Sequence, residues 1–309
     1  MHTVAVILPV GTKVVSKVPI AGTLHAYPEG TLAVIVETPI DATHAYRVRL
    51  SDGFEANLTR AQFVLLRTLQ DEGLQRGQAA LADHELTGAV IYKCLVGSRA
   101  YGLDTAESDV DTRGVYLAPA ERHWSLFGVP EQLENRETDE VYWELQKFLV
   151  LALKANPNIL EVLHSPIPLF ATPLAEELLA MRSVFLSKLV FQTYNGYVLS
   201  QFKKLTQRRR RELEFNWKHA MHLIRLLLSG ITALRECTVP VRVDESLRGR
   251  LLAIRGGEVS LDEVDRWRLD LHREFEAAFR STSLPDRPDY PAANAFLIRA
   301  RRAALAGEA

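Results

Sequence analysis

Residues 96–102 read Val-Gly-Ser-Arg-Ala-Tyr-Gly, and residues 108–116 read Ser-Asp-Val-Asp-Thr-Arg-Gly-Val-Tyr. The apolar run over 88–95 predicts a buried strand, which the Gly-Ser pair ends. A second strand is expected across the acidic segment. Because residues i and i+2 of a strand point to the same face, Asp109 and Asp111 are expected to project side by side. Two like charges this close repel unless a cation lies between them, so the pair predicts a site for a divalent metal, Mg²⁺ or Mn²⁺.

This order of strand, Gly-Ser, helical turn and second strand with Asp-x-Asp resembles the active-site signature of the polymerase-beta-like nucleotidyltransferases. A lone Asp-x-Asp is common in surface loops, but Gly-Ser at this spacing between two strands is much more specific. The longer pattern is similar to a bacterial branch of these enzymes that includes the RNA repair pathway DNA polymerase beta family. The resemblance covers roughly residues 88–300 and is tightest at the first motif. The alternative interpretation is an acidic hairpin turn without catalytic chemistry.

The resemblance implies transfer of a nucleoside monophosphate from a nucleoside triphosphate to an acceptor hydroxyl, with release of pyrophosphate. Asp109 and Asp111 would be catalytic metal ligands, and Asp139 matches the position of the third catalytic carboxylate, which also binds metal. Glu140 competes with Asp139 for this role, because a shift of one residue in strand register exchanges the two faces. Glu144 is instead expected to begin the following helix.

Two groups of residues are predicted to bind the nucleotide. Gly97 allows close approach of the backbone, because a Cβ there would collide. Ser98, at the start of a helical turn, is expected to grip phosphate oxygens. Arg99 and Ser108 complete this first group, and Arg113 is an alternative source of positive charge.

The second group lies on one face of a predicted helix. Lys218, His222 and Arg225 share that face, and the resemblance extends to the Lys-His-Ala-x-His-Leu-x-Arg-Leu pattern over 218–226. Three potential cations on an otherwise apolar helix suit a phosphate group in a cleft. The alternative is an ordinary histidine satisfied within the core.

A basic cluster is predicted to bind nucleic acid. Lys204, Arg208 and Arg211 fall at i, i+4 and i+7 of a helix and therefore share a face. Such a face can contact RNA phosphates. The neighbouring Glu212 and Glu214 favour the alternative, a solvated charged face.

Composition limits the partners. The chain has 309 residues and a net charge of −1, so nucleic-acid binding requires a local patch. Two cysteines far apart in sequence do not indicate a disulfide framework or a zinc cluster, which favours a cytoplasmic location. No stretch reaches the roughly 18 apolar residues of a membrane span.

An RNA end is the favoured acceptor. A protein side chain and a small molecule are alternatives, as is a non-catalytic, antitoxin-like binding subunit. The sequence identifies no protein partner.

The expected fold class is α+β, in four parts. Short strands separated by turns, including the Asp52-Gly53 hairpin signal, predict a small SH3-like β-barrel over 1–70, after which 71–87 form a linker. A nucleotidyltransferase α/β core with a mixed sheet is expected over 88–170, with a loop over 121–136 and a helix broken at Asn156-Pro157. Residues 171–309 are predicted to form a helical domain.

Overall fold

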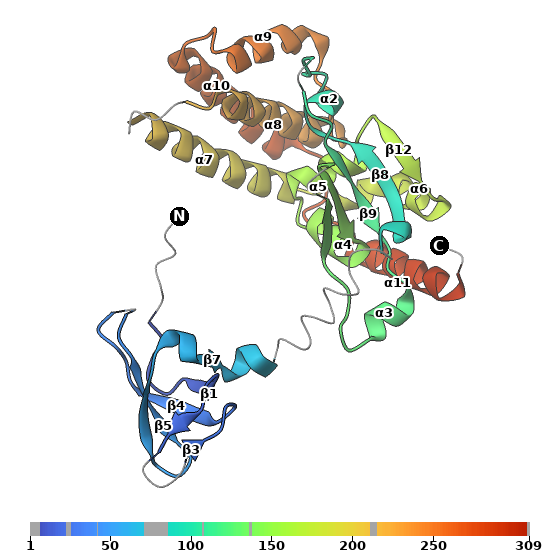
Figure 1. Cartoon of the computed structure of the whole chain (residues 1–309). Coiled ribbons are helices and arrows are strands. Elements are labelled where there is room, and N and C mark those ends of the chain that lie inside the picture. Colours follow the sequence, from blue (N-terminus) through green and yellow to red (C-terminus); the bar gives the residue numbers. More distant parts are fainter. Residues whose placement is uncertain are drawn as a thin grey trace. The chain divides into compact units, whose positions relative to one another are not determined.

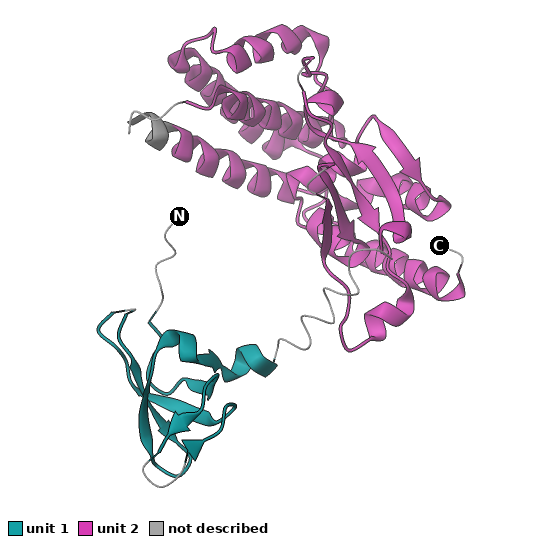
Figure 2. Ribbon diagram, viewed as in Figure 1, with its two compact units in different colours: residues 1–81 teal, residues 82–309 magenta. Residues whose placement is uncertain are grey.

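The computed structural model describes residues 7–22, 26–41, 43–70, 86–106, 108–135, 138–210 and 215–307, and over 206–210 it describes the helix but not the side chains. The chain forms two compact units, residues 1–81 and 82–309 (Figure 2). The predicted linker over 71–87 lies largely outside the described residues.

The first unit is built on a five-stranded antiparallel sheet with the order β6-β5-β4-β1-β7 (Figure 1). In the predicted Asp52-Gly53 turn, the Asp52 carboxyl accepts the Phe54 N–H at 3.0 Å, and the turn joins β5 to β6 as expected. The strands are β1 (Lys13–Ser16), β4 (Leu32–Glu37), β5 (Tyr46–Leu50), β6 (Glu55–Leu58) and β7 (Phe63–Leu65), and a separate ladder pairs β2 (Ile20–Ala21) with β3 (Ala26–Tyr27).

The small SH3-like barrel predicted for this unit is not confirmed, because the described residues form no closed barrel. Strands β6 and β7 are the two edges of the sheet, and among the described residues no ladder joins them. Alternating sequence patterns reveal the strands, but closure depends on strand tilt and stagger, which such patterns do not encode. A further strand predicted at Val4–Leu8 lies mostly outside the described residues.

The second unit contains the mixed sheet that the sequence predicted, with the order β10-β11-β9-β8-β12 (Figure 1). Strands β9 and β11 run parallel, and the other three neighbouring pairs are antiparallel. The strands are β8 (Val90–Leu95), β9 (Thr112–Tyr116), β10 (Gln132–Asn135), β11 (Glu140–Glu144) and β12 (Pro168–Ala171).

Strand β10 and the short helix α3 (Ala120–Trp124) occupy the segment 121–136, for which the sequence predicted only a loop. That prediction was wrong because three of the four β10 residues are exposed, so no run of apolar residues marks the strand. In the described part of the chain, strand β10 pairs only with β11 and forms an edge of the sheet.

The predicted helix break is confirmed. Helix α4 (Leu145–Leu153) has Glu144 as its N-cap residue, as expected, and ends before Ala155, which has a positive φ of 53°. Asn156 then caps helix α5 (Pro157–Leu163) by accepting two backbone N–H groups. The remaining helices are α2 (Gly97–Tyr101), α6 (Pro173–Ala180), α7 (Leu189–Arg210), α8 (Trp217–Glu236), α9 (Glu245–Gly256), α10 (Leu261–Ser281) and α11 (Tyr290–Ala306), with 3₁₀ turns η1 (Arg60–Gln62), η2 (Leu86–Ala89) and η3 (Arg182–Phe185).

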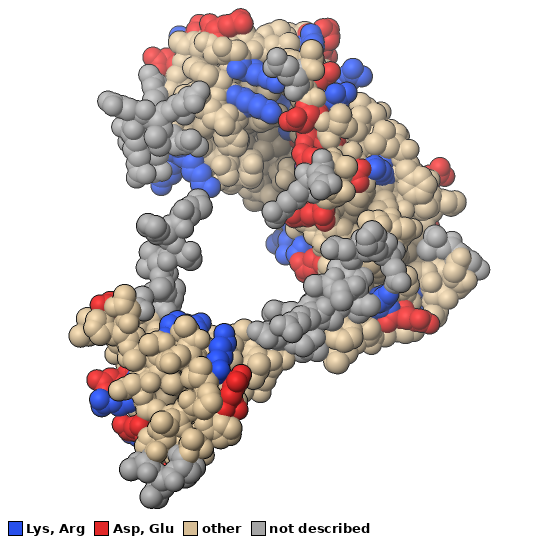
Figure 3. Space-filling view, viewed as in Figure 1, with Lys and Arg blue, Asp and Glu red and all other residues tan. Residues whose placement is uncertain are grey.

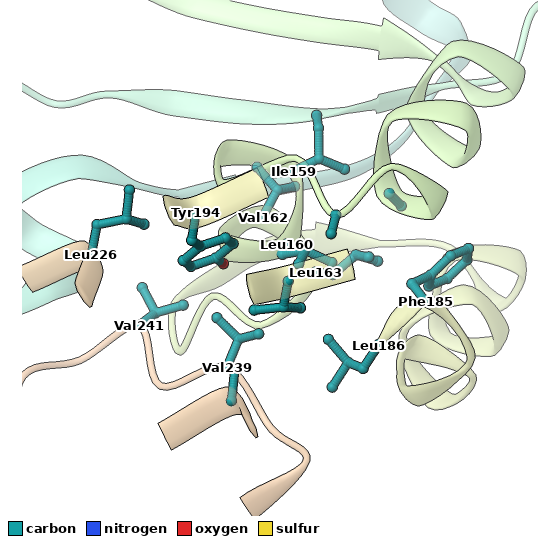
Figure 4. Packing of buried hydrophobic residues seen from close by; sticks show 14 of the residues in the cluster. Ile159, Leu160, Val162, Leu163, Phe185, Leu186, Tyr194, Leu226, Val239 and Val241 are labelled. Carbon is teal, nitrogen blue, oxygen red and sulfur yellow. The ribbon is translucent and has the colours of Figure 1, made fainter. Parts of the chain in front are cut away.

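Helix α5 lies in the middle of one hydrophobic core that extends from the sheet into the helices (Figure 4). The predicted catalytic core over 88–170 and the predicted helical domain over 171–309 therefore share their buried side chains. The α5 residues pack near side chains from η3, α7, α8 and the non-helical connector that follows α8; the labelled residues are Ile159, Leu160, Val162, Leu163, Phe185, Leu186, Tyr194, Leu226, Val239 and Val241.

Over the ranges that the structure describes, no helix combines the length and the apolar character needed to cross a membrane.

A buried ion pair joins helices α5, α8 and α2. The Arg225 Nη2 atom lies 2.7 Å from Glu161 Oε1, and both side chains are almost fully buried. The Tyr101 hydroxyl donates to Glu161 Oε2 at 2.6 Å, and the Arg225 guanidinium stacks over the Tyr101 ring at 3.6 Å. Burial opposes the charged form of Arg225, but the nearby Glu161 carboxylate outweighs burial and raises the pKa of Arg225.

We expect Glu161→Ala to lower the free energy of unfolding by about 3–5 kcal/mol, because it leaves the Arg225 charge buried without its partner. The matched control is Glu177→Ala, which breaks an exposed pair with Arg299 and is expected to cost at most about 1 kcal/mol. Urea unfolding of both variants measures the difference. Equal destabilisation would contradict a special role for the buried pair.

Candidate active site

The segment between β8 and β9 brings the predicted glycine next to the predicted acids. Gly97 begins α2 with a positive φ of 69°, a conformation that favours glycine. A Cβ atom at Gly97 would lie 2.2 Å from Asp111 Oδ2, so the collision that the sequence predicted is with this carboxylate. Gly97 therefore makes room for the Asp111 side chain.

Asp109 and Asp111 both line one cavity, although neither lies in a strand. Strand β9 begins at Thr112, directly after the second acid. The Asp111 carbonyl accepts the Val96 N–H at 3.0 Å and so extends the β8–β9 pairing by one residue. The prediction that a strand carries both acids was wrong, because β9 begins one residue after Asp111 and regular strand pairing starts only there.

Asp139 is brought to Asp111 by the parallel pairing of two strands. Glu140 lies opposite Thr112 in the β9–β11 ladder. The residues that precede them, Asp139 and Asp111, therefore lie at the same edge of the sheet. The Thr112 N–H donates to the Asp139 carbonyl at 3.2 Å. The two carboxyl groups lie close to each other, because one nitrogen of Arg113, Nη2, is 3.1 Å from Asp139 Oδ1 and 4.0 Å from Asp111 Oδ1.

Glu140, the alternative third acid, has other partners. Its carboxylate lies 2.7 Å from Lys93 Nζ and accepts the Tyr142 hydroxyl at 2.9 Å. The structure therefore places Asp139, and not Glu140, beside Asp111.

The pKa values of Asp111 and Asp139 are shifted in opposite directions. Burial, together with the neighbouring Asp139 carboxyl, raises the pKa of Asp111. The hydrogen bond from Asp111, together with the Arg113 charge, lowers the pKa of Asp139. Of the two carboxyl groups, Asp111 therefore has the higher pKa.

The cavity that contains Asp109 and Asp111 has a volume of about 270 Å³. It brings together seven residues predicted for catalysis or nucleotide binding: Gly97, Ser98, Asp109, Asp111, Lys218, His222 and Arg225. It is also lined by side chains that the sequence did not single out for binding, Tyr101, Asn158, Tyr197 and His219. Of these, His219 lies within the motif over 218–226 and could have been found there.

Arg99 and Ser108 do not line this cavity but stabilise the loop beside it. The Arg99 Nη2 atom donates to the Ser108 carbonyl at 3.2 Å. The Ser108 hydroxyl accepts the Thr105 N–H at 2.9 Å. Arg99 and Ser108 thus have hydrogen-bond partners within the loop.

The predicted stripe of three cations on α8 is reduced to one exposed charge. Arg225 is buried and paired with Glu161. Burial, followed by the charges of Arg225 and Lys218, lowers the pKa of His222 to about 3, so this imidazole is neutral. Only Lys218 of the three offers an exposed charge. The sequence pattern could not reveal this, because it does not show which helix lies opposite.

Lys204, from the predicted nucleic-acid face, lies near the cavity. Lys204 is exposed on α7. Burial of His219, a cavity residue, lowers the pKa of that histidine, and the charge of Lys204 lowers it further. The Arg208 side chain and all of Arg211 lie outside the described residues. Basic and acidic side chains are interspersed on the visible surface of this unit (Figure 3), so a nucleic-acid interface would have to be local.

The acidic residues fit a Mg²⁺ or Mn²⁺ ion in an open arrangement. Within the described ranges, no group of three or more His, Cys, Asp or Glu side chains is arranged to hold a metal ion. The site instead offers two neighbouring carboxyl groups, with Asp109 on the same cavity as Asp111. Mg²⁺ usually binds through one or two carboxylates, retained waters and substrate phosphates, which matches such a set.

Comparison with known families places the chain among the polymerase-beta-like nucleotidyltransferases. The chain belongs to the RNA repair pathway DNA polymerase beta family, whose model matches residues 72–299. The resemblance seen in the sequence is thereby confirmed.

A curated relative matches a shorter part. Over 98 residues the chain is 35% identical to the uncharacterized protein YcgL of Bacillus subtilis (strain 168). This match covers 30% of the chain and 38% of the relative, so the chain spans well under half of the relative's length.

We expect Gly97→Ala to displace the Asp111 carboxylate and to weaken Mn²⁺ binding, because the new methyl group would occupy its place. Gly128→Ala is the matched control, since Gly128 also has a positive φ, 64°, but its Cβ would meet nothing within 4 Å. Both variants carry the backbone cost of a left-handed alanine, about 1–2 kcal/mol. Mn²⁺ titration by calorimetry separates the two effects, and equal affinities would contradict the assigned role of Gly97.

Proposed function

We propose that the protein transfers a nucleoside monophosphate from a nucleoside triphosphate to an acceptor hydroxyl, with release of pyrophosphate. The observation that carries this proposal is the closeness of Asp111 and Asp139 at the edge of a cavity that also contains Gly97, Ser98 and Asp109. Membership of a polymerase-beta-like family supports the same reaction class.

In this reaction the acceptor oxygen forms a bond to the α-phosphorus, and the bond from that phosphorus to the pyrophosphate oxygen breaks. Asp109, Asp111 and Asp139 would hold Mg²⁺, which lowers the pKa of the acceptor hydroxyl and neutralises charge on the leaving pyrophosphate. We assign Asp139 to take the hydroxyl proton. Its lowered pKa keeps it ionised, and its side chain is 53% exposed and so accessible to an acceptor.

The opposite wall of the cavity suits the rest of the nucleotide. Lys218 offers an exposed positive charge for phosphate oxygens. His222 is neutral and packs edge-on against Tyr101, with ring centroids 5.7 Å apart, so it contributes shape and hydrogen bonding without charge. We assign Ser98 to the phosphates as well, because it faces the same cavity.

RNA is our proposed acceptor. The family is described by its association with RNA repair. Lys204 provides an exposed positive charge that acts on His219 in the cavity wall, which suits contact with an RNA phosphate. This arrangement gives few phosphate contacts, so RNA binding should weaken markedly as salt increases.

The direct test incubates the protein with each α-labelled nucleoside triphosphate, Mg²⁺ and total cellular RNA. We expect label in RNA, and we expect Asp139→Ala to lose it by orders of magnitude with little loss of triphosphate affinity. The matched control is Glu140→Ala, which removes the adjacent acid but leaves the Asp111–Asp139 contact intact.

Three results would overturn parts of the proposal. Label in protein or in a small molecule would retain nucleotidyl transfer and refute RNA as the acceptor. A greater loss with Glu140→Ala would refute the assignment of the third acid. No labelling and no metal-dependent triphosphate binding would favour a non-catalytic binding subunit.

A further inference from the structure

Arg113 is held in place by four contacts at the acidic edge. Its Nη1 atom donates to the carbonyl oxygens of Thr112 and Asp139, at 2.8 and 2.6 Å. Its Nη2 atom lies 3.1 Å from Asp139 Oδ1 and 4.0 Å from Asp111 Oδ1. One guanidinium therefore touches the backbone and the side chain of the third acid and lies near the second.

Asp139 needs such a support. It lies just before β11 with a positive φ of 49°, which is uncommon for a residue with a side chain. Its side chain is 53% exposed, so packing alone does not fix the carboxylate. Asp111, in contrast, is held by the β8–β9 pairing on one side and fits against Gly97 on the other.

We propose that Arg113 is a positioning residue that sets the Asp139 carboxylate beside Asp111 before a divalent cation binds. This inference rests on the proposed function, since it concerns the metal ligands of that site. It assigns to Arg113 a role in preparing the site and no contact with the reacting atoms.

The contacts favour positioning over competition for the cation's place. Two of the four partners are backbone carbonyls, which an arriving cation does not need to displace. The close contact to Asp139 uses Oδ1 and leaves the second carboxylate oxygen for the metal. A planar guanidinium can make these contacts together, whereas the single ammonium group of a lysine cannot donate to all of these partners in the same geometry.

The test measures Mn²⁺ affinity of the full chain, by calorimetry or electron paramagnetic resonance, for wild type, Arg113→Met and Arg113→Lys. We expect both variants to bind Mn²⁺ at least about tenfold more weakly, as is usual when a residue that orients a metal ligand is removed. The Mn²⁺ concentration for half-maximal turnover should rise in parallel. Thermal unfolding without metal verifies that each variant is folded.

Lys93→Met is the matched control, because it removes a positive charge that pairs with the next residue, Glu140, at 2.7 Å. We expect its Mn²⁺ affinity to match wild type. Equal or tighter binding by folded Arg113→Met would overturn the proposal and identify Arg113 as a bystander or a competitor. Wild-type affinity in Arg113→Lys would show that charge alone suffices and would also overturn it. No Mn²⁺ binding by the wild-type chain would instead refute the metal site of the proposed function, and this inference with it.

Discussion

The site depends on the parallel pairing of β9 with β11, because this pairing brings Asp111 and Asp139 to the same edge of the sheet. The two acids directly precede paired strand positions, so the sheet fixes their backbones next to each other. Gly97 leaves room on one side, and Arg113 closes the other. Repulsion between the two carboxylates destabilises the metal-free fold, and a bound divalent cation would relieve it. Active sites commonly contain such locally unfavourable arrangements.

The helical part of the unit serves the site by completing its cavity. Helix α8 contributes Lys218 and His222 to the wall, while Arg225 is directed into the core and tied to Glu161 on α5. The same helix therefore supplies a binding surface and anchors itself to the sheet region. Because the hydrophobic core is continuous between the two regions, the acidic edge and the opposite wall are held in one compact body.

The sequence was informative where local chemistry decides the structure. A Gly-Ser break, closely spaced acids and a capped Asn-Pro break were identified because each depends on neighbouring residues. It was less informative where distant contacts decide: the same helical pattern describes an exposed Lys218 and a buried, paired Arg225. The choice between Asp139 and Glu140 depended on where the β9–β11 ladder begins, which is a long-range property. The SH3-like barrel predicted for the first unit is not confirmed, since barrel closure also depends on distant contacts.

We expect a divalent cation to relieve the repulsion between Asp111 and Asp139. Thermal unfolding of wild type and Asp111→Asn at pH 7.5, with and without Mn²⁺, measures this effect. Because the folded state raises the pKa of Asp111, this group destabilises the metal-free fold as pH rises through that pKa. Asp111→Asn should therefore unfold at a higher temperature than wild type without metal, and Mn²⁺ should raise the unfolding temperature of wild type only. An equal rise in both proteins would show that Mn²⁺ does not act through Asp111.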